Sequence, residues 1–403
     1  MNKNKIIATL SDTDAYKIHM QAAVFRSYPE AEVTHKLDIR SDECLADLEG
    51  EIRAEINELR KASFSDDMIT HLKTHSPFLP SAFVDYLRGF RFDPQRDIQV
   101  YLKDDEKFGK QLAITVKGPW LRTILYEIPI LSIVSEVRNR NRFPDVKIED
   151  FRKTLFKKVE KLKLDIKTRG ITNFKFAEMG TRRRFSKEFQ HYAIQYLSAN
   201  LSEQLVGTSN YEFAREFGLT AVGTVAHEWF MFFQSETTPD KSQKMALDVW
   251  NETFRGELGI GLTDTISSDS FLKIFDPMFA KSFDGLRHDS GSPFAWGDKF
   301  ISHYESLGID PMTKTLIFTD SLDFDKCLDI CEYFAGRINI SFGIGTAISA
   351  DIEDIPGYKP LSIVMKMTSA NGHPVAKVSD EPAKAMCEDE VYLRYLKSRF
   401  EIK

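Results

Sequence analysis

The sequence predicts an α/β protein: an irregular (β/α) barrel of about seven parallel strands, plus an α+β domain built from the amino-terminal region and part of the carboxyl-terminal region. Two observations predict this class. From about residue 173 to 346, short apolar runs alternate with helical segments, as in parallel strands joined by crossover helices. Nearly every run is followed by small, polar or charged residues, and in such barrels the loops after the strands build the active site. An open doubly wound sheet is the competing architecture.

The first 150 residues mix helices and strands without strict alternation, which predicts the α+β body. Behind a Ser-Asp-Thr-Asp capping cluster, apolar residues recur at helical spacing from Ser11 to Tyr28. The remaining predicted elements are a strand at 32–40, an amphipathic helix at 43–60, strands at 98–102 and 111–118, and a long buried helix at 120–140.

The barrel region contains seven predicted strands, with helices such as 183–199 and 242–256 between them. The strands are FKFAE (174–178), EQLVG (203–207), LTAVG (219–223), GIGLT (259–263), FDGLR (283–287), KTLIFT (314–319) and INISFG (338–343). Beyond Thr346, two strand-like runs at 360–372 and 374–380 either form a hairpin or return to the amino-terminal body.

The length of 403 residues exceeds the roughly 250–300 at which single cores stop growing, so the chain is expected to have more than one domain. The predicted domains are 1–150 (α+β), 151–350 (the catalytic barrel) and 351–403, a segment returning to the amino-terminal domain.

Charge and hydropathy exclude several classes of protein. Lys plus Arg number 54 against 60 Asp plus Glu, a net charge of −6 that provides no global field for nucleic acid or an anionic membrane. No run of about 18 apolar residues occurs, and the apolar stretch at the amino terminus is shorter than a secretory signal core, so we expect a cytoplasmic protein. The four cysteines, at 44, 327, 331 and 387, match neither a redox nor a zinc pattern and are expected to be reduced packing residues.

Two of the strand-end clusters suit anions. In FGIGT, Gly343 and Gly345 let the backbone approach a phosphate, and Thr346 adds a hydroxyl at a helix start; a tight turn is the alternative. TRRR (181–184) concentrates three positive charges in an acidic protein, which favours a polyanionic substrate over a solvated face.

The other clusters carry candidates for the chemistry. Arg287 and Asp289 project on one side of a strand end, where they could hold a carboxylate and a sugar hydroxyl or form a buried ion pair. His227 lies at the same rim, either as a phosphoryl acceptor or as a core or capping group. Asp264 and Asp320 could hold a Mg²⁺ shell or ribose hydroxyls, or cap helices.

Taken together, seven motifs in order resemble those of the nicotinate phosphoribosyltransferase family. They are TDAYK (13–17), EMGTRRRFS (178–186), GTSN (207–210), GTVAHEW (223–229), LTDT (262–265), GLRHDSG (285–291) and FGIGT (342–346). The resemblance implies that nicotinate and phosphoribosyl pyrophosphate give nicotinate mononucleotide and pyrophosphate in NAD biosynthesis. It also implies Mg²⁺ and coupling to ATP through a transient phosphohistidine.

The resemblance also implies roles residue by residue. His227 would be phosphorylated, with Arg287 and Asp289 as its catalytic companions. The substrate-binding residues would be Tyr16, Thr224 and Arg287 for nicotinate, Gly343, Gly345 and Thr346 for the 5′-phosphate, Asp289 for the ribose, Arg182 for pyrophosphate, and Met179, Asp264 and Asp320 beside them. No metal ligands are assigned. A homodimer with shared active sites is implied, because the amino-terminal tyrosine would reach the neighbour's barrel.

Two positions depart from the family pattern, and two rival functions stay open. Met179 stands where relatives usually have Phe beneath the pyridine ring, and Ser292 stands where Asp more often follows DSG. The rivals are a related enzyme acting on nicotinamide or quinolinate, and a nucleotide-binding regulator without catalysis. Neither nucleic acid nor a membrane is expected as a partner.

Overall fold

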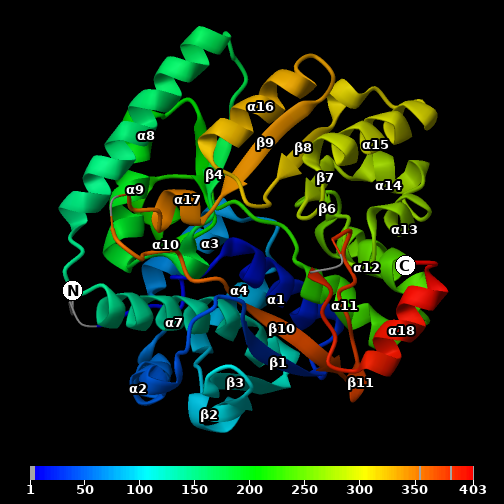
Figure 1. Cartoon of the computed structure of the whole chain (residues 1–403). Helices are drawn as coiled ribbons and strands as arrows, with labels where there is room; N and C mark the ends of the chain where they lie inside the picture. Colours follow the sequence, from blue (N-terminus) through cyan, green and yellow to red (C-terminus); the bar gives the residue numbers. More distant parts are fainter. Residues whose placement is uncertain (1–4, 354, 382–383, 403) are drawn as a thin grey trace. The chain divides into compact units, whose positions relative to one another are not determined.

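The computed structural model describes residues 5–353, 355–381 and 384–402 (Figure 1). The chain divides into two compact units, each assembled from separate stretches of sequence. Unit 1 comprises Met1–Lys161, Glu178–Val222 and Gly345–Lys366; unit 2 comprises Leu162–Ala177, Gly223–Ile344 and Met367–Lys403. The domain boundaries predicted near residues 150 and 350 stay a prediction.

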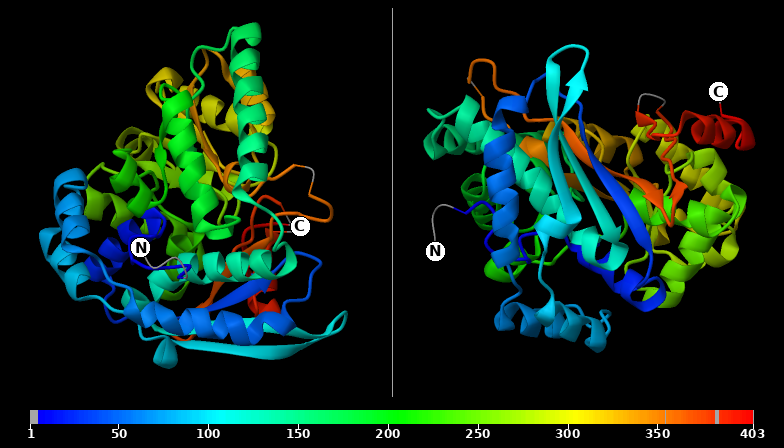
Figure 2. Two further views of the ribbon diagram at one scale, coloured as in Figure 1. Left: turned by 90° about the vertical axis from the view of Figure 1, so that its left-hand side faces the viewer. Right: turned by 90° about the horizontal axis from the view of Figure 1, so that it is seen from below.

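Unit 1 is built on antiparallel strands. Strand β3 (Gly109–Pro119) lies between β1 (Glu32–Ile39) and β2 (Ile98–Asp105). Glu32 pairs with Pro119 across β1 and β3, and Ile98 pairs with Val116 across β2 and β3. Figure 2 shows the long β2–β3 hairpin with β1 beside β3. These strands confirm the predictions at 32–40, 98–102 and 111–118.

The sequence left open whether the carboxyl-terminal strands form a hairpin or return to the amino-terminal body, and the structure shows both. Strand β10 (Ile363–Ala370) forms a hairpin with β11 (His373–Pro374), with Ala370 opposite His373. The order of the sheet is β11-β10-β1-β3-β2, so β10 also returns to the amino-terminal strands.

The helices of unit 1 differ from the predicted pattern in two places. The predicted helix at 43–60 begins at Ala46 and consists of a helix at 49–58 with a 3-10 turn at each end. The predicted helix at 120–140 is broken into a short turn, a 3-10 turn and a long helix. The elements are α1 (Ala15–Ser27), η1 (Ala46–Leu48), α2 (Glu49–Glu58), η2 (Leu59–Lys61), α3 (Asp66–His75), α4 (Ser81–Gly89), α5 (Pro94–Asp97), α6 (Trp120–Thr123), η3 (Ile124–Tyr126), α7 (Glu127–Arg142), η4 (Thr181–Arg183), α9 (Lys187–Asn200), α10 (Tyr211–Phe217) and α17 (Thr346–Ser349), with α8 (Ile148–Arg169) continuing into unit 2.

The capping cluster predicted before α1 serves another purpose. Asp14 is the N-cap residue, yet its side chain accepts no capping hydrogen bond from the helix. It accepts one from Ser209 Oγ at 2.7 Å instead, and Asp12 binds Arg184. The capping prediction is wrong because these carboxylates are buried and their nearest donors are side chains from other elements.

Unit 2 contains the parallel strands that position the site. Strands β6 (Ile260–Leu262), β7 (Gly285–His288), β8 (Thr315–Phe318) and β9 (Asn339–Ile344) pair in parallel, with Ile260, Gly285, Thr315 and Asn339 in register. Their carboxyl ends therefore lie at one edge, as parallel pairing requires. This pairing leaves no room for a side chain at Gly285, because a Cβ there would lie 1.9 Å from the carbonyl oxygen of Thr315.

Helices cover these strands on their outer side, where Figure 1 shows α14, α15 and α16. In the core between them, the ring of Phe318 lies 5.8 Å from Phe334 and 5.6 Å from Trp296, measured between centroids. The helices of unit 2 are α11 (His227–Glu236), α12 (Pro239–Phe254), α13 (Ser268–Leu272), α14 (Pro277–Ser282), α15 (Pro293–Ser306), η5 (Pro311–Thr313), α16 (Phe324–Phe334) and α18 (Glu390–Arg399).

The α/β class is confirmed. With β4 (Phe176–Glu178) and β5 (Leu205–Thr208), the parallel sheet has the order β5-β4-β9-β8-β7-β6. The remaining predicted strand, 219–223, makes a single parallel bridge between Ala221 and Thr208. Across the described residues, no helix is both long enough and apolar enough to span a bilayer. The four cysteines are free thiols.

Candidate active site

His227 is the first residue of α11 and is fixed by the packing of that helix. Ala226 precedes it in an extended conformation, and residues 228–234 are buried. The indole of Trp229 donates a hydrogen bond to the carbonyl oxygen of Ala246 at 3.0 Å, tying α11 to α12. The His227 side chain is nevertheless 17% exposed, so a rigid element presents the imidazole to solvent.

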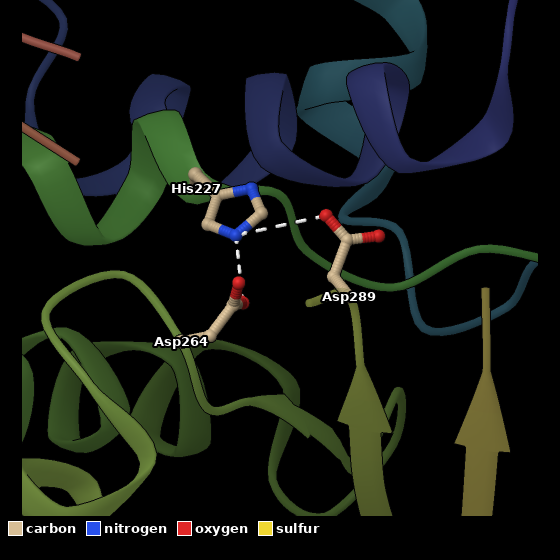
Figure 3. A group of neighbouring side chains, drawn as sticks. All are labelled: His227, Asp264 and Asp289. Atoms are coloured by element: carbon tan, nitrogen blue, oxygen red, sulfur yellow. Dashed lines mark hydrogen bonds and ion pairs between the residues drawn. The ribbon is translucent and has the colours of Figure 1, made fainter. Parts of the chain in front are cut away.

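The two ring nitrogens of His227 have different surroundings (Figure 3). Nε2 lies 2.8 Å from Oδ1 of Asp264 and 3.8 Å from Oδ2 of Asp289. Because a carboxylate oxygen can only accept, the partner assigns the ring hydrogen to Nε2, which donates it to Asp264. Nδ1 lies on the side of the ring away from Asp264. In the neutral ring Nδ1 holds the lone pair.

Asp264 follows β6 and is fully buried, with each oxygen used differently. Oδ1 accepts from His227, whereas Oδ2 accepts from Ser290 Oγ at 2.6 Å and lies 3.1 Å from Nζ of Lys377. Burial acts to raise the pKa of Asp264, but electrostatic attraction to His227 and Lys377 and hydrogen bonds from His227 and Ser290 outweigh it and hold that pKa well below its usual value. Asp264 is therefore an ionised anchor for the imidazole.

Arg287 and Asp289 form an ion pair at the end of β7, which the sequence left open beside a role in binding substrate. Nη2 of Arg287 donates to Oδ1 of Asp289 at 2.9 Å, while Nε donates to Thr319 Oγ1 at 3.0 Å and Nη1 to the Val225 carbonyl at 3.2 Å. Burial opposes ionisation of Asp289, but Arg287, followed by His227, lowers its pKa. The side chains are 20% and 24% exposed, so this ion pair faces the site rather than the core.

Burial and the neighbouring Lys377 favour the neutral form of His227. Burial is the largest influence and lowers the pKa of the imidazole, and the Lys377 ammonium lowers it further. Asp264 and Asp289 act in the opposite direction without reversing the shift. A neutral imidazole is the nucleophilic form, because protonation removes the lone pair.

Three further predicted residues lie in unit 2, and two of them have side-chain partners of their own. Thr224 donates a hydrogen bond from Oγ1 to the carbonyl oxygen of Ile260 at 3.2 Å. Asp320 follows β8 and is paired with Lys384 at 2.8 Å. Gly343 is buried within β9. In the described structure none of these three residues caps a helix.

The other predicted residues lie in unit 1. Tyr16 is in α1 and is 9% exposed. Gly345 precedes α17, which Thr346 begins, and a Cβ at Gly345 would lie 3.1 Å from the carbonyl oxygen of Met179. The close approach to Met179 explains why residue 345 is a glycine.

The arginine cluster TRRR divides into two kinds of residue. Arg184 is fully buried, donating to Asp12 at 2.8 Å and to Glu136 at 2.7 Å, so it is structural and not part of an anion site. Arg182 is 37% exposed, and its guanidinium lies 3.8 Å from Asp14 and from Glu127. Arg183 is half-buried like Arg182, so both of these arginines keep the exposure that an anion ligand requires.

His227, Asp264 and Asp289 also form a group whose ligand atoms all lie within 4.8 Å of one another. Such a group resembles a metal site, but the Lys377 ammonium lies 3.1 Å from Asp264 and 3.9 Å from Asp289. A divalent cation there would be repelled by this charge, and both oxygens of Asp264 already have partners. The group does not fit a resident metal ion.

Comparisons with known proteins identify the family to which this arrangement belongs. The model of the nicotinate phosphoribosyltransferase (NAPRTase) family matches residues 174–403, and the model of its N-terminal domain matches residues 11–135. The chain belongs to the nicotinate phosphoribosyltransferase family. A nicotinate phosphoribosyltransferase of Vibrio parahaemolyticus is 52% identical over 403 residues, covering 99% of this chain and 92% of the relative.

Solved structures of nicotinate phosphoribosyltransferases share the fold. The chain is similar to the crystal structure of the enzyme from Vibrio cholerae, with a TM-score of 0.96 and 47% identity over 99% of this chain and 95% of that one. The structure from Porphyromonas gingivalis gives a TM-score of 0.90 at 32% identity, over 98% of this chain and 100% of that one.

The sequence analysis missed three residues of the His227 cluster. Lys377, Ser290 and Ser379 all contact Asp264 or each other, with the Ser379 hydroxyl 3.0 Å from Ser290 Oγ. Lys377 carried one available signal, a charged residue within an apolar run. The departure at Ser292 has a local explanation: its Oγ accepts from the Ala295 amide and caps α15.

Proposed function

We propose that this chain catalyses the reaction of its family, in which nicotinate and phosphoribosyl pyrophosphate give nicotinate mononucleotide and pyrophosphate. ATP hydrolysis would be coupled to this reaction through a phosphohistidine at His227. One observation carries the proposal: in a member of this family, Asp264 holds a neutral imidazole at the start of a helix, next to the Arg287–Asp289 pair.

Phosphorylation would proceed at Nδ1. Its lone pair attacks the γ-phosphorus of ATP, a nitrogen–phosphorus bond forms, and the bond to the bridging oxygen breaks, so that ADP leaves with the electron pair. The ring then carries hydrogen on Nε2 and positive charge, which ionised Asp264 stabilises through the 2.8 Å hydrogen bond. Water later attacks the phosphorus and releases inorganic phosphate and the free imidazole.

Transfer of the ribosyl group would use the neighbouring charges. The pyridine nitrogen attacks the anomeric carbon as pyrophosphate leaves, through a ribose with oxocarbenium character. Asp289 is proposed at the ribose hydroxyls and Arg287 at the nicotinate carboxylate, which a guanidinium can bind with two parallel hydrogen bonds. Mg²⁺, bound to the substrate's pyrophosphate, would balance the charge of the leaving group.

The remaining assignments follow the family motifs. They are Tyr16, Thr224 and Met179 at nicotinate, Arg182 at pyrophosphate, Gly343, Gly345 and Thr346 at the 5′-phosphate, and Asp264 and Asp320 beside the substrates. The exposure of Arg182 supports its assignment to pyrophosphate.

The direct test is mass detection of the mononucleotide. The protein is mixed with phosphoribosyl pyrophosphate, Mg²⁺ and nicotinate, nicotinamide or quinolinate, each with and without ATP. Product from nicotinate alone, increased by ATP, is expected. Product from another pyridine would favour the related enzyme, and no product would favour the regulator.

The phosphohistidine is tested separately with [γ-³²P]ATP. Label should be alkali-stable and acid-labile, attached to Nδ1, and absent from His227→Asn. His191→Asn is the matched control, because His191 is 37% exposed and pairs with Glu216 on the surface. If His227→Asn kept the full ATP-stimulated rate, the coupling proposal would be wrong.

We also propose a cytoplasmic homodimer with shared active sites. Mixing Tyr16→Ala with His227→Asn tests the sharing, since mixed dimers would regain one complete site. Light scattering of the native protein gives its mass, and a monomer with full activity would refute this proposal.

A further inference from the structure

The carboxyl-terminal segment brings an ammonium group into the His227 cluster. Lys377 is 6% exposed, and its Nζ lies 3.1 Å from Oδ2 of Asp264 and 3.9 Å from Oδ2 of Asp289. A buried lysine is expensive unless it is paired, so its position between two carboxylates is specific. In the sequence, Lys377 lies 88 residues beyond Asp289 and 113 residues beyond Asp264.

The backbone on both sides of Lys377 is anchored to the elements that carry the site. Gln234, on the same helix as His227, donates to the Ala376 carbonyl at 2.7 Å and accepts from the Ala376 amide at 2.9 Å. The Val378 amide donates to the carbonyl of Thr265, next to Asp264, at 2.8 Å. The lysine is therefore held in a fixed relation to the imidazole.

The charges of the cluster balance only when Lys377 is counted. Asp264 and Asp289 contribute two negative charges and Arg287 one positive charge, so the ammonium brings the sum to zero. Arg287 bonds to Asp289 and leaves Asp264 to Lys377. Without the ammonium, a phosphoryl dianion would approach a group that is already negative, which low-dielectric surroundings penalise.

Lys377 also fixes the orientation of the Asp264 carboxylate. Together with Ser290 it occupies Oδ2, which leaves Oδ1 to accept from His227 Nε2. That arrangement keeps hydrogen on Nε2 and the lone pair on Nδ1. A carboxylate free to rotate would not hold the ring in this orientation.

We infer that Lys377 is a positioning residue for phosphorylation of His227, acting through Asp264 and through the charge balance of the cluster. This inference rests on the proposed function and extends it, because it assigns to the carboxyl-terminal segment the ATP-coupled half of the reaction. Transfer of the ribosyl group without ATP does not need the phosphoryl group, and so depends less on Lys377.

The experiment compares Lys377→Met, Lys377→Arg and native protein. Lys299→Met is the matched control, because it removes an ammonium that is 39% exposed and paired with Asp269 on the surface. Two rates are measured for each: ³²P incorporation from [γ-³²P]ATP, and ATP-independent formation of mononucleotide. Thermal unfolding of each variant reports its folding.

For Lys377→Met we expect phosphorylation to fall about 100-fold, the size typical of losing one preorganised electrostatic group. The ATP-independent rate should stay within about threefold, because that step needs no phosphoryl group on His227. Lys377→Arg should recover phosphorylation to within about tenfold of native, because it restores the positive charge. Lys299→Met should match native protein in both rates.

Three results would overturn the inference. Lys377→Met could phosphorylate at the native rate, or it could lose both rates in parallel, as a merely structural residue would. Lys377→Arg, folded, could be as deficient as Lys377→Met. If Lys377→Met does not fold, Lys377→Arg decides by the same two rates. Native protein that takes up no label at all would instead refute the phosphohistidine proposal itself, so the two failures are distinguishable.

Discussion

Replacing Asp264 with asparagine tests the central hydrogen bond of the site. The carboxamide is nearly the same size as the carboxylate, but it carries no charge. Three contacts change at once: His227 Nε2 at 2.8 Å, Ser290 Oγ at 2.6 Å and Lys377 Nζ at 3.1 Å. The substitution therefore alters the electrostatics and leaves the packing volume almost intact.

The magnitudes follow from burial. Removing one partner of a buried ion pair costs about 3–5 kcal/mol, and Lys377 would keep only Asp289, at 3.9 Å. We expect the free energy of unfolding of Asp264→Asn to fall by about 3 kcal/mol, because the amide oxygen still accepts one hydrogen bond. The phosphorylation rate should fall about 10²- to 10⁴-fold, the usual range for losing a group that orients an acid–base residue.

Two assays measure these effects. Urea unfolding gives the stability, and single-turnover transfer of ³²P from ATP gives the phosphorylation rate. Asp269→Asn is the matched control, because its carboxylate is 75% exposed and its ion pair with Lys299 contributes little. Asp289→Asn provides the contrast: its oxygen lies 3.8 Å from Nε2, so it should reduce phosphorylation less than Asp264→Asn does.

The reasoning is refuted if Asp264→Asn, measured under conditions where it is folded, transfers phosphate within twofold of native protein. It is also refuted if Asp289→Asn is the more damaging of the two for phosphorylation. Either outcome would mean that the bond to Nε2 does not set the reactive nitrogen.

Three further predictions concern stability and pH. Because burial lowers the pKa of folded His227 below its ordinary value of 6.5, only the unfolded protein gains a proton on this ring as pH falls through that value. The free energy of unfolding should therefore decline below about pH 6.5 and level off at the pKa of the folded state. Urea midpoints measured against pH should fall less steeply for His227→Asn than for native protein. Arg184→Met should cost about 3–5 kcal/mol in the same assay, since Asp12 and Glu136 would be left buried and unpaired. Gly285→Ala should cost about 3 kcal/mol, because its Cβ would lie 1.9 Å from a strand carbonyl, whereas Gly50→Ala, with nothing within 4 Å, should not destabilise.

The sequence predicted the part of the site that follows from strand order. His227, Asp264 and Asp289 were placed at one rim because parallel strands and their connecting loops end at one edge, and the structure brings both carboxylates within 4 Å of His227 Nε2. The alternation of apolar runs with helical segments is enough to predict that these strand ends share one edge. It does not determine the partner of each side chain, and the roles proposed for all of these residues, Thr224 and Asp320 among them, stay predictions.

Charge patterns were less informative than strand order. Arg182 and Arg184 are two residues apart in one basic cluster, yet one is 37% exposed and the other has no exposed surface. The difference arises from Asp12, a residue 172 positions from Arg184 whose carboxylate is fully buried. An ion pair between residues so far apart in the sequence leaves no local pattern. The residues next to the cluster therefore could not predict which arginine is buried and which is exposed.

The same limit explains why Lys377 was missed, and it indicates how such residues can be found. Ala376 and Val378 are fully buried, and in an extended segment the residue between them faces the opposite side. The usual interpretation of that alternation assigns Lys377 to the solvent face. Here the opposite face is turned toward two carboxylates, and the lysine is buried as well. A lone charge in an apolar strand is therefore as consistent with a site as with solvent, and the deciding information is which other strand ends face it.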